Sequence, residues 1–217
     1  PDAPLSGLLM AQSAQMNGKD SIARLEFESL LEDKDAAFFG LRGLMNQAMK
    51  KNDHQKALEL LRTAEGLHPK RGWIVHSLFD AEVQCRDWIR AEQTLTKAVR
   101  LGVFDRETGR QHAQAILVAR ADAALTQGLK PQALRLAKKA FRLDAGFIPA
   151  STLYARLLFK LGKKRKAVAV IEQAWPLGPH PDLAHLWDEL APEPKGKTDE
   201  ARKTYQLQWY KRLYNLA

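Results

Sequence analysis

The sequence predicts an all-α solenoid of stacked helical hairpins, and two spacings carry this prediction. Ala23, Ala57 and Ala91 are each 34 residues apart, and so are Ala133 and Ala167. The remaining gap of 42 residues is one period plus eight inserted residues. Periods of about 20–50 residues are typical of repeat proteins, in which each unit buries its apolar face against its neighbours. We call these five residues the repeat alanines.

Each repeat alanine also begins an apolar stripe with helical spacing. An apolar residue follows four positions later, and a small or apolar residue follows seven positions later. These pairs are Phe27 and Leu30, Leu61 and Ala64, Leu95 and Ala98, Ala137 and Ala140, and Ile171 and Ala174. The spacing predicts the buried face of an amphipathic second helix in each hairpin. The small residues allow the two helices of a hairpin to approach closely.

Turn residues precede the repeat alanines in a constant register. They are Gly18-Lys19-Asp20, Asn52-Asp53, Arg86-Asp87, Gly128-Leu129-Lys130 and Gly162-Lys163. Gly or Asn suits a left-handed residue at the end of one helix, and Asp suits the N-cap of the next. Pro69 and Pro179, twelve residues after Ala57 and Ala167, are expected to end the second helices there.

These signals predict one domain, residues 1–217, with about six hairpins in a right-handed superhelix and a C-terminal capping helix. The expected repeats cover about 4–35, 38–71, 72–103, 110–146 and 147–180, and an atypical cap covers 181–217. In the cap we expect a short helix at 182–190 and a last helix at about 198–216, in which Trp209 and Tyr210 are candidates for exposure. The insertion at 102–109 predicts a longer loop or an extended first helix, or alternatively a hinge.

The repeats resemble the tetratricopeptide repeat (TPR) family. The segments that carry the resemblance are Leu41-Arg42-Gly43-Leu44 followed by Asn52, Ala57, Leu61, Ala64 and Pro69, and Tyr154-Ala155 followed by Leu158, Gly162, Ala167, Ile171, Ala174 and Pro179. The first-helix signature of the family is degenerate. The resemblance implies a protein-interaction domain with the first helix of each hairpin on the inner, concave surface.

Four segments together resemble a narrower group, the C-terminal TPR region of the HemY family of proteobacteria. They are Phe39-Gly40-Leu41-Arg42-Gly43-Leu44, the stretch from Trp73 to Ala91, Gly146-Phe147-Ile148-Pro149-Ala150, and the stretch from His180 to Pro192. This resemblance implies an N-terminal membrane anchor and a TPR domain on the cytoplasmic face of the bacterial inner membrane, where it organises haem-biosynthesis enzymes. Because the sequence begins at Pro1 rather than Met, we expect the anchor to lie outside it.

Helical periodicity on the first helices gives the candidate partner-binding groove. Its residues are Arg42, Asn46, Met49 and Lys50 in the second repeat, Trp73, His76, Asp80 and Val83 in the third, Val118, Asp122 and Leu125 in the fourth, and Thr152, Arg156, Phe159 and Lys160 in the fifth. Arg42 and Asn46 are one turn apart, so both can address one carboxylate or backbone carbonyl. They resemble half of the clamp with which some TPR domains hold a C-terminal carboxylate. The alternative is a solvated pair.

The charge is strongly uneven along the chain. Residues 1–108 carry 15 basic and 16 acidic side chains, whereas residues 109–217 carry 19 basic and 9 acidic ones. Such asymmetry favours an acidic partner or an anionic lipid surface, with a solvated helix face as the alternative. Nucleic acid is disfavoured because the basic runs lack interleaved aromatic residues.

The sequence contains none of the common catalytic motifs, so we expect that the protein is not an enzyme. The chain has no phosphate loop, no His-Glu-x-x-His and no paired cysteines, and Cys85 is its single cysteine. His180 and His185 are five residues apart across a proline, a poor spacing for a shared metal, so neither a metal nor a cofactor is expected. The leading hypothesis is a non-catalytic scaffold. The alternatives are a carrier that binds haem or porphyrin directly, and a general TPR assembly factor of the cell envelope.

Overall fold

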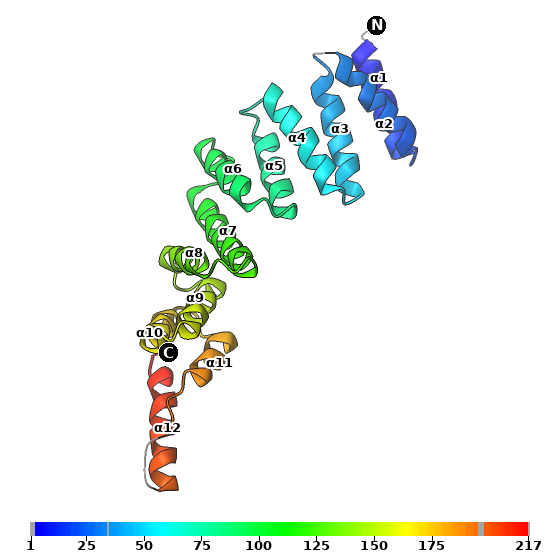
Figure 1. Ribbon diagram of the computed structural model, residues 1–217. Coiled ribbons are helices and arrows are strands. Elements are labelled where there is room, and N and C mark those ends of the chain that lie inside the picture. The colour runs from blue at the N-terminus through cyan, green and yellow to red at the C-terminus, as the bar shows by residue number, and fades with distance from the viewer. Residues whose placement is uncertain (1–2, 34, 195–197, 217) are drawn as a thin grey trace. The chain divides into compact units, whose positions relative to one another are not determined.

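The structure is a computed structural model that describes residues 3–33, 35–194 and 198–216. These residues form twelve α-helices and two short 3₁₀ segments, and no strand occurs among them (Figure 1). They fall into two compact units, Pro1–Gly109 and Arg110–Ala217, which we call unit 1 and unit 2 and consider separately. That the two units form one continuous array stays a prediction of the 34-residue spacing.

Unit 1 is a succession of helices, each packed on the next. They are α1 (Ala3–Met16), α2 (Asp20–Ser29) with the 3₁₀ segment η1 (Leu30–Glu32), α3 (Ala37–Lys50), α4 (His54–Leu67), α5 (Gly72–Gln84), α6 (Trp88–Arg100) and the first residues of α7 (Arg106–Thr126). Contacts join α1 to α2, α2 to α3, α3 to α4, α4 to α5 and α5 to α6. Helices adjacent in sequence are therefore adjacent in space, as a stack of hairpins requires.

Unit 2 continues from within α7. It contains α8 (Lys130–Leu143), α9 (Ile148–Lys160), α10 (Lys164–Ala174), the 3₁₀ segment η2 (Trp175–Leu177), α11 (Pro181–Glu189) and α12 (Asp199–Tyr214). α9 packs on α8, α10 and α11. The extended-helix interpretation of the insertion at 102–109 is confirmed, because α7 begins inside it at Arg106 and runs for 21 residues.

The repeat alanines are the centres of the helix contacts. All five are 0% exposed, and the residues four and seven positions after each of them are buried as well. Gly or Ala at such points leaves room for the backbone of the partner helix, whereas a larger side chain would push it away. Ala201 keeps the 34-residue period in sequence but is exposed on α12. The sixth unit therefore shares the spacing of the repeats and not their packing.

The turns between paired helices have the expected left-handed residue. Positive φ occurs at Gly18, Asn52, Arg86, Gly128 and Gly162, the same place in each of five hairpins. The expectation that an Asp caps the next helix is confirmed at two of these turns. There, the carboxylates of Asp53 and Asp87 accept hydrogen bonds from backbone N–H groups in the first turn of the following helix. It is wrong for Asp20, which is the first residue of α2 rather than its cap.

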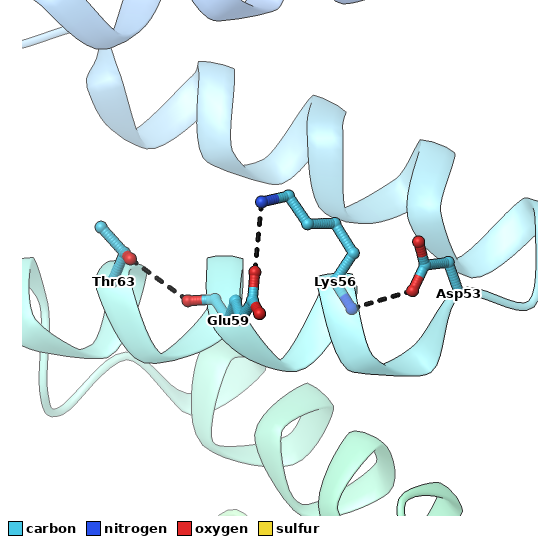
Figure 2. A network of polar contacts seen from close by, with 4 residues as sticks. All are labelled: Asp53, Lys56, Glu59 and Thr63. Carbon is cyan, nitrogen blue, oxygen red and sulfur yellow. Dashed lines mark hydrogen bonds and ion pairs between the residues drawn. The ribbon is translucent and has the colours of Figure 1, made fainter.

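The outer surface of α4 shows how charges are arranged on the second helices of unit 1. The Asp53 carboxylate accepts from the backbone N–H of Lys56 at 3.0 Å, and the Lys56 ammonium pairs with Glu59 at 3.1 Å (Figure 2). The Thr63 hydroxyl donates to the Glu59 carbonyl at 3.2 Å. These are local contacts on an exposed helix face, each worth less than about 1 kcal/mol.

The expectation of an exposed Trp209 and Tyr210 is wrong in its first half. Tyr210 is 46% exposed, but Trp209 is half-buried against Trp187 of α11. Trp187 and Trp209 are 22 residues apart in the sequence, so the helical spacing within either segment gives no indication of this contact.

Candidate protein-interaction surface

The groove residues expected on α3 lie on one side of that helix. Arg42, Asn46 and Lys50 follow one another at four-residue intervals, and all three are exposed. Met49 is half-buried and packs on the core that α4 and α5 share with α3. The α3 face thus offers a guanidinium, an amide and an ammonium above an apolar base.

Arg42 is the polar edge of a larger group that we call the arginine–aromatic cluster. Its members are Phe38, Arg42, His68, Arg71 and Trp73. The Arg42 guanidinium carbon lies 5.5 Å from the centre of the Trp73 ring, and that of Arg71 lies 5.5 Å from the centre of the Phe38 ring. The Phe38 ring meets the rings of Trp73 and His68 edge to face, at 5.3 and 5.1 Å between centroids.

The local sequence explains why these side chains meet. Phe38 stands one turn before Arg42 on α3, so both project from one face of that helix. His68 ends α4, and Arg71 is the N-cap residue of α5, with Trp73 in the first turn of α5. Three of the five members therefore come from the short connection between α4 and α5 and from the first turn of α5, and they lie against the face of α3.

Neither arginine of the cluster is neutralised within the described part of unit 1. No described carboxylate forms an ion pair with Arg42 or Arg71, and the contact of each is with an aromatic ring. Stacking on a ring contributes about 0.5–1 kcal/mol at an exposed site and orients the guanidinium. A guanidinium stacked in this way still has its in-plane N–H donors available. Two of these donors can bind one carboxylate through a pair of hydrogen bonds.

His76 and Asp80 on α5 differ from the arginines because they contact each other. The His76 Nδ1 lies 3.0 Å from a carboxylate oxygen of Asp80, and the His76 ring packs on Phe104 at 5.1 Å. Both side chains are about half exposed. They belong to the same helix as Trp73, but each already has a partner within its own repeat.

The groove residues expected in unit 2 do not form a comparable cluster. Arg156 and Lys160 are exposed one turn apart on α9, and Phe159 is half-buried with the Lys164 ammonium 5.6 Å from its ring centre. Asp122 is exposed on α7, and no polar contact joins it to Arg156 or Lys160 in the described part of unit 2.

Thr152 is a clear correction to the expected groove. It is only 7% exposed, and its hydroxyl donates to the Ile148 carbonyl at 2.8 Å. Val118 and Leu125 are half-buried and pack against the core of unit 2, so their place in the groove stays a prediction. Helical periodicity alone assigned Thr152 to the surface, whereas its side chain is covered in the folded chain.

Three members of the arginine–aromatic cluster, Phe38, His68 and Arg71, are absent from the sequence-based groove. Phe38 could have been predicted from the sequence, because it precedes Arg42 by the same four residues that separate Arg42 from Asn46 and so lies on the same helix face. His68 and Arg71 could not, because they belong to a connection whose path depends on how α4 meets α5.

The histidines and the single cysteine lie apart from one another in the described part of the chain. The described residues contain no group of three or more His, Cys, Asp or Glu side chains arranged to hold a metal ion. His180 is the N-cap of α11, where its Nδ1 accepts from the backbone N–H of Asp182. Cys85 is half-buried, and burial raises the pKa of its thiol. None of the described helices combines the length and apolar character needed to cross a membrane.

Comparison with known proteins supports the fold assignment. No protein-family model matches the chain, and no curated protein matches its sequence. Among solved structures, the chain is similar to YrrB, a TPR protein with an unusual peptide-binding site, with a TM-score of 0.50, 17% identity, and coverage of 84% of this chain and 90% of YrrB. MamA has a TM-score of 0.49 with 16% identity, covering 80% of this chain and 91% of MamA. A TPR protein from Parabacteroides merdae has a TM-score of 0.48 with 16% identity, covering 100% and 80%.

The helix order, the buried repeat alanines and the similarity to YrrB agree on one architecture. The chain is an all-α solenoid of the TPR type.

Proposed function

We propose that the chain is a non-catalytic scaffold in which unit 1 binds a carboxylate-bearing segment of a partner protein at the arginine–aromatic cluster. The observation that carries the proposal is the pair of guanidinium groups, Arg42 and Arg71, which are stacked on rings and have no described carboxylate partner. A planar guanidinium held in this way is suited to bidentate recognition of a carboxylate.

The neighbouring side chains define the rest of the proposed binding site. Asn46 lies one turn from Arg42 and can bind a backbone amide of an extended segment. Phe39 is 44% exposed at the start of α3 and offers apolar contact beside Phe38. A segment with a carboxylate next to an apolar side chain fits this combination. The other predicted groove residues are proposed as partner contacts within each unit separately, His76 and Asp80 in unit 1 and Asp122, Arg156, Phe159 and Lys160 in unit 2.

The test compares partner capture by matched variants. Arg42→Ala combined with Asn46→Ala is expected to reduce capture at least about tenfold while lowering the free energy of unfolding by no more than about 1 kcal/mol, because both side chains are exposed and only the stacking of Arg42 on Trp73 is lost. Arg42→Lys keeps the charge and loses the planar stacking, so it is expected to bind weakly as well. Arg24→Ala, which removes an exposed arginine that is paired with Glu28 on α2, serves as the control. Equal capture by the Arg42 variants and the control would refute the proposed site.

The finer assignment within this function comes from the sequence resemblance to the HemY family. On that basis we propose a tether to the bacterial inner membrane, with the TPR domain on its cytoplasmic face beside anionic lipid, and enzymes of late haem biosynthesis as partners. A pull-down of the anchored protein from its own host, with the partners identified by mass spectrometry, tests this assignment. Recovery of unrelated envelope proteins would favour a general assembly factor.

A haem or porphyrin carrier is separated from a scaffold by titration with haem. The scaffold predicts no saturable shift of the Soret band. A saturable shift that disappears in His68→Ala or His76→Ala would replace the scaffold with a carrier, because His68 belongs to the cluster and His76 follows Trp73 by three residues, so both are potential axial ligands at the proposed surface.

A further inference from the structure

An open pocket of about 620 Å³ lies between α8 and α10 of unit 2, with α9 beneath it. Its floor is apolar and is formed by Phe141, Tyr154, Leu158 and Val170. The Phe141 and Tyr154 rings pack together at 5.5 Å, so the floor belongs to the core of the unit. The volume falls within the range of about 300–1,000 Å³ that is typical of ligand pockets.

The rim of this pocket is basic. Lys138 and Arg142 project from α8, and Lys166 projects from α10, and all three are exposed. No described residue of unit 2 forms an ion pair with any of them. The acidic member of the lining, Asp144, has its carboxylate engaged by the backbone N–H of Gly146 at 2.8 Å.

The second helices of unit 1 show the opposite arrangement. There, Lys56 pairs with Glu59, Lys97 pairs with Glu65, and Arg62 of α4 pairs with Asp87 at the start of α6. These three basic side chains of unit 1 are thus paired internally, whereas the three around the α8–α10 pocket have no ion-pair partner among the described residues of unit 2. Three of the basic residues after Gly109 therefore border a recess with an apolar base.

We propose that the α8–α10 pocket is a second protein-binding site, which takes an acidic segment with one large apolar side chain. The apolar side chain fills the space above Phe141 and Val170, and flanking carboxylates bind Lys138, Arg142 and Lys166. This site lies on second helices of unit 2, so it does not depend on the arginine–aromatic cluster of unit 1.

The shape of the pocket favours a peptide over nucleic acid or lipid. Binding of single-stranded nucleic acid relies on successive exposed aromatic faces on which several bases stack, whereas the two aromatic rings of this lining, Phe141 and Tyr154, pack on each other at the base of one recess. A membrane surface binds through exposed apolar side chains that enter it, whereas the apolar residues here lie at the bottom of a recess. A protruding side chain of a protein segment fits a recess of this kind.

The test uses the full chain and a short fluorescein-labelled peptide in which glutamates flank a single phenylalanine. Saturable binding is expected, and it is expected to weaken at least about tenfold when serine replaces the phenylalanine. Ala169→Trp places a ring in the pocket from an exposed position. This variant is expected to block binding without disturbing the core, which circular dichroism and thermal unfolding verify.

A matched pair of triple variants separates the pocket from general electrostatic attraction. Lys138→Ala, Arg142→Ala and Lys166→Ala together are expected to abolish saturable binding. Lys130→Ala, Arg135→Ala and Lys203→Ala remove the same charge from exposed positions outside the pocket lining and are expected to retain it. Equal losses in the two triples, equal binding of the serine peptide, or no binding of either peptide would overturn the proposal.

Two further probes address other classes of ligand. Single-stranded polyuridine and vesicles of phosphatidylserine with phosphatidylcholine are titrated against the same variants. Binding of either probe that is lost on Ala169→Trp, without binding of the phenylalanine peptide, would assign the pocket to that class and overturn the peptide proposal.

Discussion

Trp187 and Trp209 form a reciprocal pair that attaches the last helix to unit 2. The indole N–H of Trp187 donates to the Trp209 carbonyl at 3.3 Å, and the indole N–H of Trp209 donates to the Trp187 carbonyl at 3.2 Å. Their rings stack with centroids 4.2 Å apart and planes 19° apart. Arg212 lies over both rings and pairs with Glu172 of α10. Leu213 is the buried residue of α12, so the tryptophan pair provides much of its attachment.

Trp209→Ala is expected to detach α12 while leaving the rest of unit 2 folded. Loss of a half-buried indole, its stacking and the hydrogen bond that its N–H donates corresponds to about 2–3 kcal/mol, near the low end for removal of a large aromatic side chain. Hydrogen exchange should show loss of amide protection confined to α12. Tyr214→Ala, at a position that is 80% exposed, is the control and should leave protection unchanged. Unchanged protection of α12 in Trp209→Ala would show that the pair does not hold the helix.

Ala91→Leu tests the role of the repeat alanines in helix packing. Ala91 is 0% exposed between α5 and α6, so the added methyl groups must displace neighbours at a cost of about 1–3 kcal/mol. Ala201→Leu is the matched control. Ala201 follows the last repeat alanine, Ala167, by the same 34 residues, but it is exposed. This substitution should change stability by less than about 0.5 kcal/mol. Urea unfolding of both variants measures the difference, and similar effects would mean that Ala91 is not tightly packed.

The sequence predicted the hairpins well because their determinants are local and repeated. The Asn52-Asp53 turn, Ala57 and Leu61 all lie within ten residues of the sequence. Together they are sufficient to predict one turn and the buried stripe of the helix that follows it. The contact between Trp187 and Trp209 could not be predicted in this way, because it joins two residues of different helices that lie 22 residues apart in the sequence. Arg71 likewise reaches Phe38 only through the packing of α4, α5 and α3.

Periodicity also assigned some residues to the wrong environment. Thr152 lies on the expected surface of its helix but is covered, and Ala201 continues the alanine period but is exposed. A periodic pattern gives the direction in which a side chain projects from its helix, whereas burial depends on whether another helix lies in that direction.

Gly43→Ala is expected to destabilise unit 1 although alanine favours helices. A Cβ at Gly43 would lie 2.3 Å from atoms of the Phe27 ring, so α2 and α3 could not keep their present separation. The cost of this overpacking, about 1–3 kcal/mol, exceeds the gain in helix propensity of about 1 kcal/mol.

Gly66→Ala is the matched control for that substitution. Gly66 is also helical, near the end of α4, and a Cβ there would meet no atom within 4 Å. This variant should be stabilised by about 0.5–1 kcal/mol. Opposite signs in thermal unfolding are therefore expected for two Gly-to-Ala changes in adjacent helices, and stabilisation of both would contradict the close approach of Phe27 to Gly43.

Glu82 is a buried carboxyl group in the core of unit 1, and it gives stability a defined pH dependence. It is 3% exposed, one of its carboxylate oxygens has no hydrogen-bond partner among the described residues, and burial raises its pKa despite a hydrogen bond from Thr94. The folded protein therefore binds this proton more tightly than the unfolded chain does. Stability from this group is greatest below the unfolded pKa near 4.5 and falls as the pH rises through the higher folded pKa.

Glu82→Gln is expected to remove that pH-dependent loss. Because the amide carries no charge, the variant should unfold about 2–4 °C higher than the parent at neutral pH, equivalent to about 1 kcal/mol, and the two should converge in acid. Thermal unfolding between about pH 4 and pH 8 measures both curves. Glu59→Gln, at an exposed position on α4, is the control and should parallel the parent. If the unfolding temperatures of Glu82→Gln and the parent changed with pH in the same way, ionisation of Glu82 would not destabilise the folded protein.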